Sequence, residues 1–248
     1  MRVACFDIGR KNFAFYVEEI VPSDLESLRD RFISLAKKDQ RRIRGDMNPK
    51  VEEIHRDLFK CGKRVEMRVT DLTDESGELN NNVRLNLQTF LEEYEELWNT
   101  CNIFVIEEQY YNPHVKFGGA GGGAGGSGIN KDAILLGEAC YTYFINNHYP
   151  FRDVMYFKSM LKTQTFGCPD YTTIVNKEGL RTSRKTTKPD RKKWSVVKGK
   201  EILELRGDEQ GLNQIINGKK IYRQKQDDVC DCILMCQAYI FKTFVIPF

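Results

Sequence analysis

The chain has 248 residues, of which 41% are apolar and 29% are charged, as in an ordinary globular protein with one core or two small ones. No apolar stretch is long enough to cross a bilayer as a helix, so we expect no membrane-spanning helix, and the formal net charge is only +3. Eight cysteines form no C-x-x-C pair and the three histidines are scattered, so we expect no zinc site and an intracellular, reducing compartment.

The first third of the chain predicts three strands and one helix. An apolar run predicts a buried strand at residues 2–8, which leaves no place for a signal peptide, and a short turn then leads to a second strand at 13–17. Residues 24–44 are charged and helix-prone, whereas 45–62 predict no clear element. Alternating apolar residues predict a half-exposed strand at 64–72.

The remaining apolar spacings predict helices and strands in alternation: helix 83–98, strand 103–107, helix 130–147, strand 153–157 and helices 192–205 and 227–244. This order predicts an α/β fold with a mixed sheet flanked by helices and a helical insertion early in the chain. We expect one domain over residues 1–248.

A glycine tract at residues 118–128 holds eight glycines. It could pass for a phosphate-binding loop, but it lacks the lysine of the G-x-x-x-x-G-K-[ST] motif. We therefore interpret it as a flexible loop, either natural or introduced by engineering.

Positive charge is concentrated late in the chain. Between Lys158 and Lys200 there are twelve Lys or Arg residues against three Asp or Glu. Within that stretch, Arg181 to Lys193 holds seven positive residues and one negative. Such a segment indicates either a polyanion partner such as nucleic acid or a solvated loop, and it could also serve as a nuclear signal.

Four acidic residues follow apolar runs or lie on an apolar helix: Asp7, Glu107, Asp228 and Asp231. Singly, each has an ordinary explanation, such as a turn, a polar strand end or an acid at a helix start. Together they are harder to explain, because two like charges about 4 Å apart repel by roughly 4 kcal/mol at an effective dielectric near 20. Bound cations would offset this repulsion, and Mg²⁺ prefers oxygen ligands of this kind.

Three motifs together resemble the RuvC-type Holliday junction resolvases, which have the RNase H-like fold, and are most similar to the branch found in poxviruses and other large DNA viruses. They are Asp7-Ile8-Gly9-Arg10-Lys11-Asn12-Phe13-Ala14, Ile106-Glu107-Glu108-Gln109 and Lys225-Gln226-Asp227-Asp228-Val229-Cys230-Asp231. The resemblance covers about two-thirds of the chain. It implies a mixed five-stranded sheet, with insertions in this chain near 22–62 and 160–190.

The resemblance also implies a catalytic site. Asp7 would be shared by two Mg²⁺ ions, with Mn²⁺ as a possible substitute, and Glu107, Asp228 and Asp231 would complete the ligand set, with Glu108 and Asp227 as the neighbouring alternatives. A lysine before the last helix would assist catalysis. We predict Lys193 for this role, with Lys192 and Lys198 as alternatives.

The family acts as a homodimer that nicks two opposed strands of a four-way DNA junction, which implies branched DNA and a second copy of the chain as partners, and no membrane or small-molecule substrate. Phosphate contacts would dominate recognition. The candidate DNA-binding residues are Arg10, Lys11, Arg184, Lys185, Lys188, Arg191, Lys192 and Lys198.

Three other functions share parts of this pattern. An RNase H-like nuclease acting on RNA–DNA hybrids or on other branched DNA would use the same metal site. A catalytically inactive junction-binding module would gain nothing from acids beside phosphates. An actin-like ATPase would need a second phosphate loop, which the sequence does not show. For a viral resolvase, we expect the host cytoplasm or nucleus.

Overall fold

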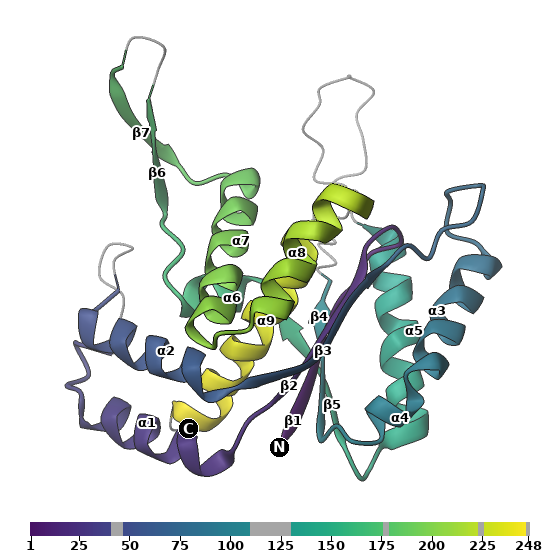
Figure 1. The fold of residues 1–248 in the computed structure, drawn as a ribbon, viewed down its shortest axis with the longest axis horizontal. Coiled ribbons are helices and arrows are strands. Elements are labelled where there is room, and N and C mark those ends of the chain that lie inside the picture. The colour runs from purple at the N-terminus through teal and green to yellow at the C-terminus, as the bar shows by residue number, and fades with distance from the viewer. Residues whose placement is uncertain (41–46, 110–129, 176–178, 223–225, 247–248) are drawn as a thin grey trace.

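The computed structural model describes residues 1–40, 47–109, 130–175, 179–222 and 226–246. At its centre lies a five-stranded sheet in the order β3-β2-β1-β4-β5 (Figure 1). The strands are β1 (Arg2–Asp7), β2 (Phe13–Glu19), β3 (Lys63–Thr70), β4 (Ile103–Glu108) and β5 (Asp153–Lys158). Strands β1, β4 and β5 are parallel, and β2 is antiparallel to both β1 and β3. The predicted α/β class, with the mixed sheet of an RNase H-like fold, is therefore confirmed.

Helices cover both faces of this sheet (Figure 1). One face packs against α3 (Asn81–Glu93), α4 (Glu95–Trp98) and α5 (Lys131–His148). The other face packs against α9 (Gln226–Ile240), with α1 (Pro22–Ser34), α2 (Pro49–Cys61), α7 (Lys188–Leu205) and α8 (Glu209–Tyr222) around it. No helix in the described part of the chain is long and apolar enough to span a membrane.

Alternation along β1 sends side chains into two separate cores. Val3 and Cys5 belong to the core under α9, whereas Ala4 and Phe6 belong to the core under α3 and α5. The second core is rich in aromatic rings, and the rings of Phe104 and Phe144 stack with centroids 4.1 Å apart. Val3 to Phe6 are therefore buried on both faces of the sheet, up to the polar end of the strand at Asp7.

Helix starts carry the capping residues expected of them. The side chains of Asn48, Asn80 and Asn130 accept backbone N–H bonds at the starts of α2, α3 and α5. Thr187 and Asp190 form a reciprocal capping box at the start of α7. This box begins α7 at Lys188, four residues before the predicted start.

The predicted helix at 24–44 is too long. Helix α1 ends at Ser34, and the Gln40 side chain donates hydrogen bonds to the carbonyls of Phe32 and Leu35 at 3.2 and 3.0 Å. These bonds satisfy carbonyls that a continued helix would have used. The predicted helix at 83–98 is broken at Tyr94 into α3 and α4.

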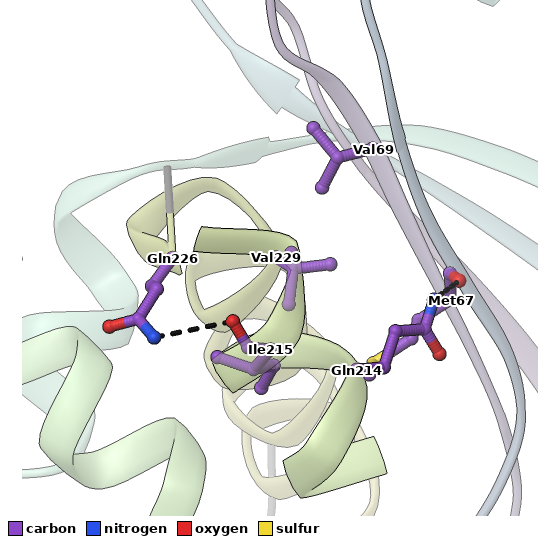
Figure 2. A pocket seen from close by; sticks show the side chains of 7 residues that line it. Met67, Val69, Gln214, Ile215, Gln226 and Val229 are labelled. Atoms are coloured by element: carbon purple, nitrogen blue, oxygen red, sulfur yellow. Dashed lines mark hydrogen bonds between the residues drawn. The ribbon is translucent and has the colours of Figure 1, made fainter. Parts of the chain in front are cut away.

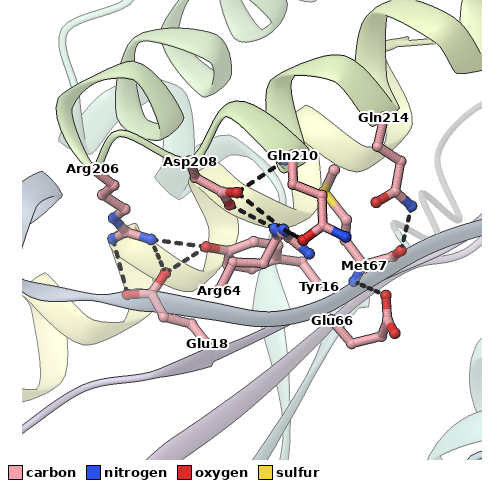
Figure 3. Close-up of polar contacts among 10 residues, drawn as sticks. Tyr16, Glu18, Arg64, Glu66, Met67, Arg206, Asp208, Gln210 and Gln214 are labelled. Carbon is pink, nitrogen blue, oxygen red and sulfur yellow. Dashed lines mark hydrogen bonds and ion pairs between the residues drawn. The ribbon is translucent and has the colours of Figure 1, made fainter.

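A buried ion pair joins the end of α7 to the middle of the sheet (Figure 3). Arg206 donates to both carboxylate oxygens of Glu18, at 2.7 and 3.0 Å, and to the hydroxyl of Tyr16 at 2.8 Å. Gln237 of α9 donates a further bond to Glu18 at 2.7 Å. Three elements that are distant in sequence are thereby fixed to one another.

Helix α8 has no counterpart among the elements predicted from the sequence. It lies between β3 and α9 and borders a small pocket (Figure 2). The side chain of Gln214 donates to the carbonyl of Met67 at 2.8 Å, and Gln226 donates to the carbonyl of Ile215 at 3.2 Å. These two bonds attach α8 to the sheet on one side and to the first turn of α9 on the other.

The two predicted insertions contain regular structure. The segment 22–62 holds α1 and α2, and 160–190 holds α6 (Met160–Thr165) and a two-stranded ribbon of β6 (Tyr171–Val175) and β7 (Arg181–Lys185). A π-helical turn, η1 (Phe241–Val245), extends α9. The glycine tract at 118–128 lies outside the described residues.

Candidate active site

Asp7 and Glu107 lie side by side at the ends of two parallel strands. The register pairs Phe6 of β1 with Ile106 of β4, so the next residue of each strand faces α9. Burial, and then the charge of Glu107, raise the pKa of Asp7 well above its ordinary value. Asp7 and Glu107 are joined by a side-chain hydrogen bond, which also favours the protonated form of Asp7.

Lys162 is the cation that holds this cluster together. Its ammonium group lies 3.1 Å from Oε1 of Glu107 and 2.9 Å from Oδ2 of Asp231, and its side chain is only 7% exposed. Burial alone would lower the pKa of Lys162, but the charges of Glu107, Asp231 and Asp7 together raise it. The lysine is therefore charged in the folded protein.

The charge of Lys162 acts in turn on its carboxylate partner. Burial would raise the pKa of Glu107, but Lys162 and the hydrogen bonds from Asp7, Lys162 and Gln109 lower it. The amide of Gln109 donates to Oε2 of Glu107 at 3.0 Å. Both carboxylate oxygens of Glu107 are thus engaged, next to an Asp7 whose pKa is raised.

Helix α9 brings the third acid to the cluster. Asp231 pairs with Lys162 through Oδ2, while its Oδ1 is buried without a hydrogen-bond partner among the described residues. Asp228 lies one helical turn earlier and is 9% exposed. The structure therefore brings Asp7, Glu107 and Asp231 together and places Asp228 beside them on the same helix.

The neighbouring alternatives are placed differently. Asp227 forms an ion pair with Lys192 across the gap between α9 and α7. Glu108 is the last residue of β4, where alternation directs its side chain to the face opposite Glu107. Both positions favour our choice of Glu107 and Asp228 over these two residues.

The sequence does not predict Lys162 as the lysine that assists catalysis. It names Lys193, with Lys192 and Lys198 behind it, but Lys193 is exposed on α7. Within the described ranges no ion pair joins Lys193 to an acid, and Lys198 pairs with Glu201 at 2.7 Å. Lys162 could have been found from its position four residues after β5, because parallel β4 and β5 end at the same edge of the sheet.

The cluster has the chemistry of a site for a hard cation, although the full ligand set is not assembled. Across the described part of the chain, no group of three or more acidic, histidine or cysteine side chains is arranged to bind a metal ion. Lys162 instead supplies positive charge between Glu107 and Asp231. The oxygen donors, the unpartnered Oδ1 of Asp231 and the raised pKa of Asp7 nevertheless fit Mg²⁺, whose charge would favour the ionised form of Asp7 and which would use the free oxygen of Asp231.

Several predicted DNA-binding residues are engaged within the protein. Arg10 pairs with Asp132 at 3.0 Å, Arg184 with Asp190 at 2.7 Å, Lys192 with Asp227 and Lys198 with Glu201. Their side chains are held in position by these acids. The exposed residues of the predicted set are Lys11, Lys185, Lys188 and Arg191.

No protein-family model matches the chain. Among curated proteins it is 28% identical over 247 residues to the uncharacterized protein 170L of Invertebrate iridescent virus 6, covering 96% of this chain and 87% of that protein. It is 25% identical over 255 residues to the uncharacterized protein 97L of Invertebrate iridescent virus 3, covering 96% and 98%.

Two of the solved structures similar to this chain are junction complexes. The fowlpox virus resolvase with Holliday junction DNA aligns at 13% identity and a TM-score of 0.49, covering 98% of each chain. RuvC of T. thermophilus with a Holliday junction substrate aligns at 10% identity and a TM-score of 0.43, covering 97% of this chain and 94% of that one. Both are proteins of the class that the sequence motifs resemble.

Proposed function

We propose that this protein is a divalent-cation-dependent endonuclease that resolves four-way DNA junctions. The observation that carries the proposal is the cluster of Asp7, Glu107 and Asp231, drawn from β1, β4 and α9 around one buried lysine. So much negative charge at a strand edge is costly unless a cation or proton offsets it. Asp7, Glu107 and Asp231 each lie in one of the three motifs that resemble RuvC-type resolvases, which supports phosphodiester hydrolysis.

The residues of the cluster have separable tasks. Asp7, Glu107, Asp228 and Asp231 would hold Mg²⁺, two ions in the full site, with Mn²⁺ as a substitute. The bound ions would lower the pKa of an attacking water and stabilise charge on the leaving oxygen. Asp7 would serve as a carboxylate ligand, and the charge of a bound cation would offset the burial and the Glu107 charge that raise its pKa.

Lys162 would act on the phosphate. Its ammonium has three donors, and two of them are used by Glu107 and Asp231 in this structure. With Glu107 and Asp231 holding Mg²⁺, the ammonium of Lys162 could instead donate to a non-bridging oxygen of the scissile phosphate. There it would stabilise the charge that develops in the transition state.

Branched DNA is the substrate we infer, as part of viral genome processing or recombination. Both curated relatives are viral proteins, and exposed Lys185, Lys188 and Arg191 follow one another near the start of α7. Phosphate contacts from such residues recognise shape and charge rather than base sequence. Paired nicks in opposed strands need two sites, so we propose a homodimer as the active form.

A cleavage assay tests the proposal. The purified chain is incubated with a labelled four-way junction, a linear duplex and an RNA–DNA hybrid, each with Mg²⁺ or with EDTA. Asp7→Asn is the test variant, and Asp30→Asn, an exposed aspartate on α1, is the matched control. We expect paired symmetric nicks in the junction alone, absent with EDTA and with Asp7→Asn, and unchanged with Asp30→Asn.

The other outcomes separate the alternatives. Cleavage of the hybrid instead of the junction would retain the metal site but make the protein an RNA–DNA hybrid nuclease. Junction binding without cleavage, unaffected by Asp7→Asn, would contradict the catalytic proposal and indicate a binding module.

A further inference from the structure

The β6–β7 ribbon stands clear of the five-stranded sheet, beyond the start of α7 (Figure 1). A two-stranded ribbon has little stability of its own, so its position depends on how its base is held. The hydroxyls of Thr172 and Thr186 lie 3.0 Å apart, and the N–H of Thr186 donates to the carbonyl of Asp170 at 2.8 Å. Arg184 makes two bonds to Asp190 in the first turn of α7, at 2.7 and 3.0 Å. The base is therefore fixed to α7.

These bonds leave the opposite face of the ribbon to solvent. Alternation places Thr172 and Arg184 on the anchored face and puts five other described side chains on the second face. Those five are all exposed: Tyr171, Thr173, Arg181, Ser183 and Lys185. Tyr171 is 66% exposed and so presents its aromatic ring on this face, beside the charges of β7.

The chemistry of this second face fits the backbone of DNA. Arg181 and Lys185 are four residues apart on β7, or about 13 Å at roughly 3.3 Å per residue. Two hydroxyl groups lie between the two charges, and no acidic residue occurs in β6 or β7. A two-stranded ribbon also has the width that the major groove admits. An apolar protein partner would explain Tyr171 but not the two cations.

The ribbon is also connected to the acidic cluster. β7 leads directly into α7, whose Lys192 pairs with Asp227 at the start of α9. Asp228 follows Asp227 directly, and Asp231 lies about one turn further along α9. DNA held on the ribbon would thus extend toward the end of the molecule that carries the site.

We propose that the β6–β7 ribbon is a DNA-binding arm that holds a duplex segment of the substrate away from the point of cleavage. The proposal rests on the proposed function only in taking the substrate to be DNA. It assigns phosphate contacts to Arg181 and Lys185 and an aromatic groove contact to Tyr171.

Binding measured against salt concentration tests the arm. Fluorescence anisotropy of a labelled linear duplex and a four-way junction is recorded in EDTA with the full chain, from low to moderate salt. The test variant is Arg181→Gln/Lys185→Gln. The matched control is Lys37→Gln/Lys38→Gln, which removes the same charge from exposed lysines that follow α1. Melting temperatures confirm that both variants are folded.

The wild type should bind both DNAs. For the ribbon variant, the slope of log affinity against log salt concentration should be shallower by about 1.8, because each of the two lost phosphate contacts contributes about 0.9 to it. Near 0.1 M salt, the ribbon variant should bind DNA roughly tenfold more weakly or worse than the wild type. Tyr171→Ala should weaken binding without changing that slope. Equal slopes for the ribbon and control variants, or no binding of duplex by the wild type, would overturn the proposal.

The result is independent of catalysis. Asp7→Asn should retain the slope of the wild type, because the cluster and the ribbon use different residues. A protein that fails to cleave the junction but shows the ribbon-dependent slope would contradict the proposed function and support the arm.

Discussion

At the scale of single residues, the site is governed by the hydrogen bond between Asp7 and Glu107 and by the charge of Lys162 beside them. Asp7 is the carboxyl whose pKa is raised, by burial first and by Glu107 second, while Glu107 has its pKa lowered. The ionised form of Asp7 is therefore disfavoured in the metal-free protein. A bound cation would favour that form, so cation binding should depend on pH.

Asp7→Asn should stabilise the metal-free protein at neutral and alkaline pH. The pKa of Asp7 is higher in the folded chain than its value of 3.8 in the unfolded chain, so stability falls as pH rises from about 4 through the raised value. An asparagine has no such dependence. Urea denaturation in EDTA at several pH values measures the difference in unfolding free energy between Asp7→Asn and the wild type. This difference should vanish near pH 3. A less stable Asp7→Asn at pH 8 would show that the buried carboxyl does not destabilise the metal-free fold.

Lys162→Met should lower both stability and junction cleavage more than Lys193→Met does. It leaves Glu107 and Asp231 buried without their cation, which typically costs about 3–5 kcal/mol. Junction cleavage should fall by roughly two to three orders of magnitude. Lys193→Met, on an exposed position of α7, should change stability by less than about 0.5 kcal/mol. Equal losses from the two variants, in denaturation and in cleavage, would contradict the role given to Lys162.

At the scale of elements, the Glu18–Arg206 pair decides how α7 is attached to the sheet. Arg206→Met should cost about 3–5 kcal/mol, because Glu18 is fully buried and would lose its guanidinium partner. The double variant Glu18→Leu/Arg206→Met should cost less than Arg206→Met alone, since no buried charge remains. Arg2→Met breaks an exposed pair with Glu19 and should cost under about 1 kcal/mol. Chemical denaturation measures all three, and an additive double variant would refute the coupling.

The sequence predicts a helix or strand correctly where a local pattern of apolar residues determines it. The five strands follow from apolar runs or, for β3, from alternating apolar residues, and Asp7 and Glu107 could be placed because each ends an apolar run. Helix α8 could not be predicted, because its glycines and asparagines (Gly211, Asn213, Asn217 and Gly218) are weak helix formers, and its bonds to Met67 and Gln226 are tertiary.

Contacts between distant parts of the chain explain the other omissions. Lys162 lies on a six-residue helix with no pattern of its own, and it reaches Glu107 from 55 positions away. Glu18 and Arg206 are separated by 188 positions. The sequence predicts the β6–β7 ribbon only as part of a basic insertion, because threonine, serine and arginine are as typical of a solvated loop as of a strand.

At the scale of the whole molecule, the fold gathers its functional groups at one edge. Parallel β1 and β4 end together, α9 begins beside them, and α7 links this edge to the basic ribbon (Figure 1). The rest of the sheet and its two cores keep these ends in register. The proposed nuclease activity would need this combination, because charge must be held close at the cleavage point while the substrate is bound elsewhere.

A crystal structure with Mn²⁺ and its anomalous signal tests the central claim, that these carboxylates form one divalent-cation centre. We predict an anomalous peak bounded by the oxygens of Asp7, Glu107 and Asp231, with the ammonium of Lys162 moved from its place between Glu107 and Asp231. The peak should disappear in Asp7→Asn. No peak at the cluster under saturating Mn²⁺, with Lys162 still bridging the two carboxylates, would contradict the account.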